Sequence, residues 1–396
     1  MTGQAIELHH GDCLDILRGM PGNSVDSIVT DPPYGLRFMG SRWDYDVPSV
    51  AIWAECLRVL KPGGHLLAFA GTRTQHRMAV RIEDAGFEVR DMIAWVYGSG
   101  FPKSLDVSKA IDKAVGAERE VIRDVKAGRS GSADETQSGG RNYRHGEDRS
   151  ITAPATDAAR QWQGWGTALK PAMEPITMAR KPLVGTVAAN VQEHGTGALN
   201  IDGCRVPSKP GDKGEWPVTA RSDARGSMAG PMSAVVTDQS TGRWPANLIH
   251  DGSGEVLALF PQSVSRPAKA VLAGGVSGVD AYDRTVYGGF SGACRIGYAD
   301  SSVSAARFFY VPKASKSDRG EGNDHPTVKP TGLMAYLCRL VTPPRGVILD
   351  PFMGSASTGV AALQAGYRFI GVEQDAHYFD VAVKRLEAIA GEMASV

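Results

Sequence analysis

Strand-like and helix-like segments alternate at both ends of the chain, and this alternation restricts the fold more than any other feature. In the N-terminal part, four apolar or β-branched runs predict strands over residues 6–9, 25–30, 65–70 and 89–97. Between them, apolar residues at helical spacing predict helices over 50–60 and 74–85, each followed by glycine or by proline and glycine. Such alternation is typical of a mainly parallel sheet covered by helices.

The same pattern resumes after a long irregular stretch. It predicts helices over residues 331–341, 357–365 and 376–389, and strands over 346–350 and 369–373. We therefore expect the two ends of the chain to build one doubly wound α/β sheet. This divides the chain into a first half of the sheet domain (1–125), an inserted region (126–310) and a second half of the sheet domain (311–396).

The inserted region differs in composition from both ends. Residues 128–149 are polar and rich in Gly and Ser, which predicts a loop. Residues 160–319 hold 18 Lys and Arg against 13 Asp and Glu, interleaved with aromatic side chains. Among these aromatic residues are Trp162, Trp165, Trp216, Trp244, Tyr282, Tyr287, Phe290 and Tyr298. This mixture fits a nucleic-acid surface, although an irregular region of ordinary charge would look the same.

Composition excludes several classes of protein. Lys and Arg together number 43, as do Asp and Glu, so no global positive field marks a nucleic-acid partner. No run of 18 apolar residues and no secretion signal is present, so we expect no membrane association. The five cysteines are scattered and never form C-x-x-C, and the histidines lack spaced partners, so we expect no metal site. A cytoplasmic globular protein fits these observations.

The tetrapeptide Asp31-Pro32-Pro33-Tyr34 follows directly after the strand predicted for residues 25–30. As local structure it is a turn, because Pro-Pro cannot continue a sheet. The two prolines also keep the backbone extended and without N–H groups. The Asp31 carboxylate and the Pro32 carbonyl can then accept both hydrogens of one exocyclic NH2 group, while the Tyr34 ring stacks on the base that carries it.

The second motif, DPFMGSAST at residues 350–358, lies between a predicted strand and a predicted helix. A glycine loop at a helix N-terminus forms a concave site for a polar or anionic group. The P-loop lysine is absent, and Ala356 stands where a dinucleotide loop needs its second glycine. Glu373 ends the next predicted strand, where a carboxylate can accept hydrogen bonds from ribose hydroxyls. We expect a nucleoside ligand that has no pyrophosphate.

Together the two motifs resemble those of the amino-methylating DNA methyltransferases, in which D-P-P-Y is catalytic and D-P-F-x-G-S binds S-adenosyl-L-methionine. The catalytic motif comes more than 300 residues before the cofactor motif, which resembles the circularly permuted β-class order. Gly11-Asp12-Cys13 resembles the family's G-D element, and HPTVKP at 325–330 resembles its H-P-T-x-K-P element. The resemblance covers roughly the first 120 and the last 85 residues and implies a Rossmann-like class I methyltransferase fold.

The resemblance also implies the roles of individual residues. The implied catalytic residues are Asp31, Pro32, Pro33 and Tyr34. The implied cofactor-binding residues are Asp12, Lys329, Asp350, Phe352, Gly354, Ser355, Ser357 and Glu373. Within the cofactor site, Asp12 is expected at the adenine, Glu373 at the ribose, and Lys329, Asp350 and the Gly354 loop at the methionine end. The implied reaction is direct in-line methyl transfer to the N6 amine of an adenine flipped out of DNA, with no metal and no covalent intermediate.

Alternatives remain at the level of the substrate. The N4 amine of cytosine has a similar geometry, although Ser in place of Asp31 would favour it. Protein-glutamine or RNA-adenine methyltransferases often carry N-P-P-Y with the cofactor motif first, which this chain does not. A catalytically idle DNA-binding module is the alternative from another class. The sequence leaves open a cognate restriction endonuclease or an orphan or phage enzyme, and a monomer or a homodimer.

Two segments near the catalytic motif are further candidates. Trp43-Asp44 can form a lid over a flipped base, or a packed loop. Residues 101–104, of sequence FPKS, follow a predicted strand and can bring Lys103 to a DNA phosphate.

Overall fold

The computed structural model describes residues 5–36, 44–100, 104–125, 149–207, 242–260, 262–263, 303–310, 318–320 and 322–394. Its main body is an eight-stranded sheet with the strand order β1-β12-β11-β2-β3-β7-β4-β8. The strands are β1 (Ile6–His10), β2 (Val25–Thr30), β3 (Leu60–Phe69), β4 (Glu88–Val96), β7 (Met173–Arg180), β8 (Leu248–His250), β11 (Val347–Asp350) and β12 (Arg368–Glu373).

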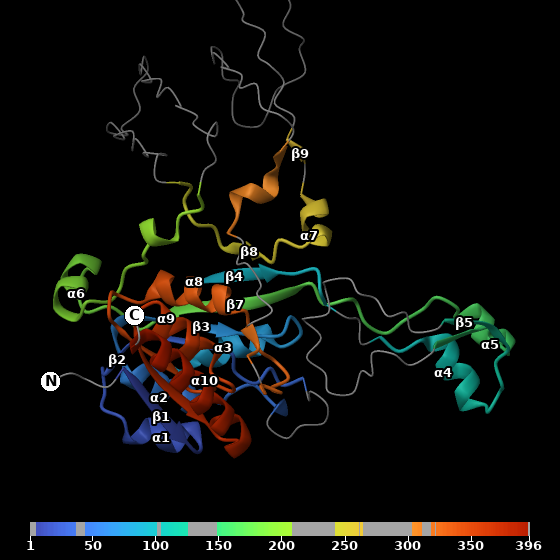
Figure 1. Cartoon of the computed structure of the whole chain (residues 1–396), viewed down its shortest axis with the longest axis horizontal. Coiled ribbons are helices and arrows are strands. Elements are labelled where there is room, and N and C mark those ends of the chain that lie inside the picture. The colour runs from blue at the N-terminus through green and yellow to red at the C-terminus, as the bar shows by residue number, and fades with distance from the viewer. Residues whose placement is uncertain are drawn as a thin grey trace, which may run out of the picture.

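Five neighbouring strands, from β1 through β12, β11 and β2 to β3, are parallel. The N-terminal and C-terminal parts of the chain therefore alternate within one sheet, as the sequence predicts. Figure 1 shows the blue N-terminal and red C-terminal elements packed together in one body. Because β11 lies between β12 and β2, the ends of strands far apart in the sequence meet at one carboxyl edge.

Helices cover both faces of the sheet, which makes it doubly wound. On one face pack α1 (Cys13–Gly19), α2 (Val50–Val59) and α3 (Gln75–Asp84), and on the other α8 (Thr331–Val341), α9 (Ser357–Gln364) and α10 (Ala376–Ala394). Alternate side chains of one strand enter opposite cores: in β2, Ile28 packs towards α2, and Val29 towards α8 and α9. The predicted fold class, an α/β doubly wound and mostly parallel sheet, is confirmed.

The region 126–310 contributes two strands to this sheet. β7 runs antiparallel between β3 and β4, and β8 pairs in parallel with β4 at the sheet edge. The pattern of residues 173–180, MEPITMAR, mixes charged residues and a proline with apolar ones, so the sequence did not predict this strand. Helices α6 (Val187–His194) and α7 (Gly254–Leu259) and the short pair β9 (Gln262–Ser263) and β10 (Val303–Ser304) also belong to this region.

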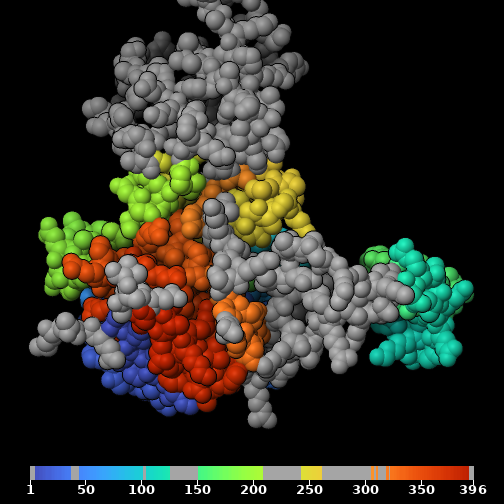
Figure 2. Space-filling model, viewed as in Figure 1, coloured from blue at the N-terminus to red at the C-terminus, as the bar shows by residue number. Residues whose placement is uncertain are grey.

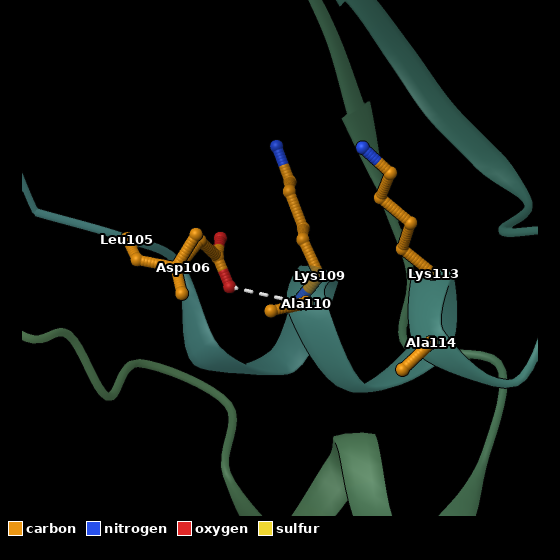
Figure 3. Close-up of a pocket in the computed structure, with 6 residues that line it drawn as sticks. All are labelled: Leu105, Asp106, Lys109, Ala110, Lys113 and Ala114. Carbon is orange, nitrogen blue, oxygen red and sulfur yellow. Dashed lines mark hydrogen bonds between the residues drawn. The ribbon is translucent and has the colours of Figure 1, made fainter. Parts of the chain in front are cut away.

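A small unit stands apart from the sheet between β4 and β7. It contains α4 (Val107–Ala114), the antiparallel pair β5 (Val121–Val125) and β6 (Arg149–Thr152), and α5 (Asp157–Gln161). Figures 1 and 2 show that it projects from the main body. A shallow depression on α4 is lined by three apolar side chains, by Asp106 and by Lys109 and Lys113. The ammonium groups of the two lysines extend to the same side (Figure 3). Among the described residues, no helix is long and apolar enough to cross a membrane.

Candidate active site at the carboxyl edge of the sheet

The two sequence motifs meet where β2 and β11 end side by side. Thr30, the last residue of β2, donates its hydroxyl hydrogen to Oδ1 of Asp350 at 2.6 Å. Asp31 therefore begins the catalytic motif directly beside the first residue of the DPFMGS motif, although 319 positions separate them in the sequence. Glu373 ends β12, the strand next to β11. Asp31, Asp350 and Glu373 thus lie at the ends of three adjacent strands along one edge of the sheet.

Asp31 lies in a cluster of charged and hydroxyl groups. Its Oδ2 accepts a hydrogen bond from Nζ of Lys329 at 2.6 Å, and its Oδ1 accepts one from the Tyr34 hydroxyl at 2.7 Å. Glu174 of β7 approaches the same groups, with its Oε2 3.0 Å from the Tyr34 oxygen and 3.3 Å from Nζ of Lys329. The Lys329 side chain is only 7% exposed, whereas those of Asp31 and Glu174 are 17% and 20% exposed. Both carboxylates therefore keep a limited opening to solvent.

The cluster shifts the acidity of its members. Burial lowers the pKa of Lys329, but Asp31 and Glu174 oppose this and leave its pKa above the usual value. Burial, reinforced by the same two carboxylates, raises the pKa of Tyr34 well above its ordinary range. Lys329 is therefore a fixed cation and Tyr34 a neutral hydroxyl at neutral pH. The neutral Tyr34 hydroxyl donates its hydrogen directly to Asp31. The prediction that the Tyr34 ring stacks on a base did not include this contact.

Asp44 fixes the backbone that follows the catalytic motif. Its Oδ1 accepts hydrogen bonds from the N–H groups of Tyr34 at 2.7 Å and Gly35 at 2.8 Å, and its Oδ2 from that of Leu36 at 3.2 Å. Gly35 has a φ of +68°, where a side chain is strained. Asp44 is 2% exposed and thus belongs to the packed turn. Trp43, the other half of the predicted lid, and residues 101–103 lie outside the described residues.

Asp350 makes its hydrogen bonds to other groups of the protein. It is 2% exposed, and its oxygens accept hydrogen bonds from Thr30, from the Phe352 N–H at 3.1 Å and from the Thr358 hydroxyl at 2.6 Å. Burial raises the pKa of Asp350 to about 6, against the opposing effect of these three donors. The carboxylate therefore ties the end of β2 to the DPFMGS loop and to the first turn of α9.

The DPFMGS loop turns sharply before α9. Gly354 has a φ of +53°, and a Cβ there would lie 2.8 Å from Nε2 of His325, so the loop and the HPTVKP segment pack too closely for a side chain. The Gly354 N–H donates to Glu373 at 2.9 Å. Ala356, the N-cap of α9, is also left-handed at φ +62°, and no side chain of the described residues caps this helix. Its first-turn N–H groups are oriented to favour a ligand with negative charge.

The other predicted cofactor residues occupy different positions around this loop. Asp12 is exposed at the end of β1 and caps α1 with Oδ1. Phe352 packs edge-on against Trp53. Ser355 and Ser357 are buried, at 3% and 9% exposure. The Ser355 hydroxyl contacts Asn323 and Arg385, each at 3.1 Å, which fixes the loop from the side of α10.

The structure thus separates the predicted site into two adjoining parts. Asp31, Tyr34 and Lys329 form one cluster, and the Gly354 loop with Glu373 forms the other. Lys329, expected beside the cofactor, bonds to Asp31. Sequence reasoning missed Glu174, which lies in a segment that mixes charged residues and a proline with apolar ones and carries no motif.

The predicted nucleic-acid surface is described only in part. Trp162 and Trp165 of the projecting unit are 41% and 60% exposed, with ring centroids 5.1 Å apart. Trp244 is 60% exposed, with the Arg205 guanidinium 5.5 Å from its ring centroid. In the described ranges, no group of three or more His, Cys, Asp or Glu side chains is arranged to hold a metal ion.

The fold and the site define an α/β protein with a D-P-P-Y cluster and a glycine loop at one edge of a doubly wound sheet. A family model described as DNA methylase, of the N6/N4 type, matches residues 25–121 and 281–384, slightly more than half of the chain. The chain belongs to this N6/N4 DNA methylase family.

Individual relatives are similar over shorter segments or at lower identity. The type II methyltransferase M2.DpnII of Streptococcus pneumoniae is 47% identical over 64 residues, which are 16% of this chain and 24% of that protein. The crystal structure of an M1.HpyAVI–SAM complex aligns over 96% of this chain and 98% of its own, with 17% identity and a TM-score of 0.41. The cytosine-N4-specific PvuII DNA methyltransferase aligns over 98% of this chain and 92% of its own, with 14% identity and a TM-score of 0.40.

Proposed function

We propose that this chain is a DNA methyltransferase that transfers the methyl group of S-adenosyl-L-methionine to the exocyclic N6 amine of a flipped adenine. The observation that carries the proposal is the junction of the two motifs. Thr30, which precedes the catalytic Asp31, hydrogen-bonds directly to Asp350 of the cofactor motif. An amine held at Asp31 would therefore lie beside a ligand held at the Gly354 loop.

The residues of the second motif fit the proposed cofactor. The side-chain-uncapped N-terminus of α9 suits the carboxylate of a methionine moiety. Glu373, at the neighbouring strand end, and the exposed Asp12 supply acceptors for ribose hydroxyls and for an adenine amine. The bound cofactor supplies an electrophilic methyl group on its sulfonium sulfur.

The chain's own residues supply orientation. The Asp31 carboxylate and the Pro32 carbonyl accept the two hydrogens of the target amine, which directs the nitrogen lone pair away from the base plane. Lys329 and Tyr34 hold the carboxylate in place before the substrate arrives, so little reorganisation is needed. Removal of Asp31, the preorganised acceptor itself, is expected to lower turnover by about 10²–10³.

Asp at the first motif position favours adenine over cytosine as the target. The test is expression of the full chain in a host that lacks DNA methylation, followed by sequencing of the host DNA for modified bases. We expect N6-methyladenine within one recognition word, and none when Asp31→Ala is expressed at the same level. N4-methylcytosine would move the assignment to the alternative base, and unmodified DNA from cells with folded wild-type protein would refute the proposal.

A further inference from the structure

Glu174 belongs to neither motif, yet it lies against the catalytic cluster. It is the second residue of β7, the antiparallel strand inserted between β3 and β4. Its carboxylate accepts hydrogen bonds from the hydroxyls of Tyr34, at 3.0 Å, and of Tyr97, which follows β4. It also forms an ion pair with Lys329 at 3.3 Å. The side chain is therefore held from three directions.

One cation serves two carboxylates in this cluster. Nζ of Lys329 is 2.6 Å from Asp31 and 3.3 Å from Glu174. The ammonium group also lies 4.9 Å from the ring centroid of Phe69 and 5.5 Å from that of Tyr34, so aromatic faces enclose it. Because Lys329 is almost fully buried, its charge is weakly screened and acts on whichever carboxylate is present.

The Tyr34 hydroxyl is shared in the same way. It carries one hydrogen and lies 2.7 Å from Asp31 and 3.0 Å from Glu174. Rotation about the C–O bond can move this hydrogen from one acceptor to the other without moving the oxygen. With Glu174 present, Oδ1 of Asp31 can release the Tyr34 hydrogen and accept one from a substrate amine instead.

We propose that Glu174 is a positioning residue for methyl transfer, which keeps the Asp31 carboxylate available as an acceptor by sharing the charge of Lys329 and the hydrogen of Tyr34. This inference rests on the proposed function. Without a negative charge at position 174, Lys329 interacts with Asp31 alone. A carboxylate so neutralised accepts hydrogen bonds from a neutral amine less strongly.

Two substitutions at position 174 separate charge from shape. Glu174→Gln keeps the size of the side chain and removes the charge, whereas Glu174→Asp keeps the charge and shortens the side chain. We expect kcat at saturating cofactor to fall about tenfold or more in Glu174→Gln, a smaller effect than loss of a group in direct contact with substrate. Glu174→Asp should retain more activity than Glu174→Gln, and neither should change the affinity for S-adenosyl-L-methionine measured by calorimetry.

Glu88→Gln is the matched control. Glu88 of β4 pairs with Arg180 at the opposite end of β7, at 2.6 Å, so its removal also breaks a carboxylate–cation pair on this strand. It should leave kcat unchanged. Thermal unfolding of all variants reports whether each one is folded.

The outcomes distinguish this inference from the proposed function. If the wild type is active and the kcat of Glu174→Gln equals or exceeds that of Glu174→Asp, the role of Glu174 is overturned. The methyltransferase assignment then stays intact. A failure of Glu174→Asp to fold while Glu174→Gln folds with normal kcat would overturn it as well. A folded wild type that transfers no methyl group to DNA would overturn both.

Discussion

Replacement of Asp44 by Ala tests whether the turn after the catalytic motif has to be held in place. The substitution removes three hydrogen bonds from backbone N–H groups to a buried carboxylate. Hydrogen bonds to charged groups contribute about 1.5–3 kcal/mol each, but the freed N–H groups lie at half-buried positions where water can reach them. We therefore expect a total loss of about 3 kcal/mol in the free energy of unfolding, less than the summed range of roughly 4.5–9 kcal/mol because water replaces part of each lost bond.

Activity should fall for a separate reason. Tyr34 lies at the start of this turn, and its hydroxyl positions Asp31. A displacement of the reacting groups by about 1 Å can cost on the order of 10²-fold in rate. Urea unfolding monitored by tryptophan fluorescence gives the stability change, and a methyl-transfer assay well below the unfolding transition gives kcat. Cofactor affinity by calorimetry should stay unchanged, because the contacts described for Asp44 are with Tyr34, Gly35 and Leu36 and not with the Gly354 loop.

Asp44→Asn is the graded control for this prediction. An asparagine oxygen in the place of Oδ1 still accepts from Tyr34 and Gly35, so of the three backbone bonds described above, the one from Leu36 is lost. We expect a destabilisation of about 1 kcal/mol, close to one ordinary hydrogen bond, and a smaller decrease in kcat. Wild-type stability and turnover in Asp44→Ala would show that the turn keeps its conformation without the carboxylate, and would refute the reasoning.

Three other predictions concern separate parts of the molecule. Glu373→Ala removes the acceptor at the end of β12 and the partner of the Gly354 N–H, so cofactor affinity should weaken roughly ten- to hundredfold by calorimetry, and equal affinity would contradict it. Tyr34→Phe keeps the ring but loses the bond to Asp31, so turnover should fall about tenfold without vanishing; wild-type kcat would mean that the hydroxyl is dispensable. His65 is 4% exposed, and burial lowers its pKa to about 4. As the pH falls below 6.5, the unfolded chain therefore binds a proton at His65 that the folded chain does not bind. This difference lowers the free energy of unfolding by about 3 kcal/mol at pH 4 relative to pH 7. His65→Leu should therefore reduce the dependence of the free energy of unfolding on pH between about 4 and 7, and an unchanged slope would contradict the lowered pKa of His65.

The central parallel strands could be predicted because they are buried on both faces. In β2, for example, every residue is buried, and four of its six residues (Val25, Ile28, Val29 and Thr30) are β-branched. β7 lacks this signal, since Pro175 normally argues against an interior strand. In the structure Pro175 pairs with Ala94 of β4 but lies one residue beyond the end of the β3 pairing, where its missing N–H breaks no bond to β3.

The residues of the candidate site that belong to one short motif could be predicted from the sequence. The contacts that the tertiary structure makes between distant segments could not. Asp31, Tyr34, Gly354 and Glu373 lie at strand ends that the periodic pattern locates. The contact between Lys329 and Asp31 spans 298 positions, and no local pattern encodes which carboxylate a lysine will meet.

The charges around Asp31 are better explained by function than by stability. Burial of an ammonium group and two carboxylates requires their desolvation, and a well-packed apolar group of similar size is often as stable or more stable. The cluster contains one more negative than positive charge, because Lys329 faces both Asp31 and Glu174. A cluster built only for stability would pair its charges one to one. The excess negative charge lies where the proposed amine would donate one of its two hydrogens to the Asp31 carboxylate.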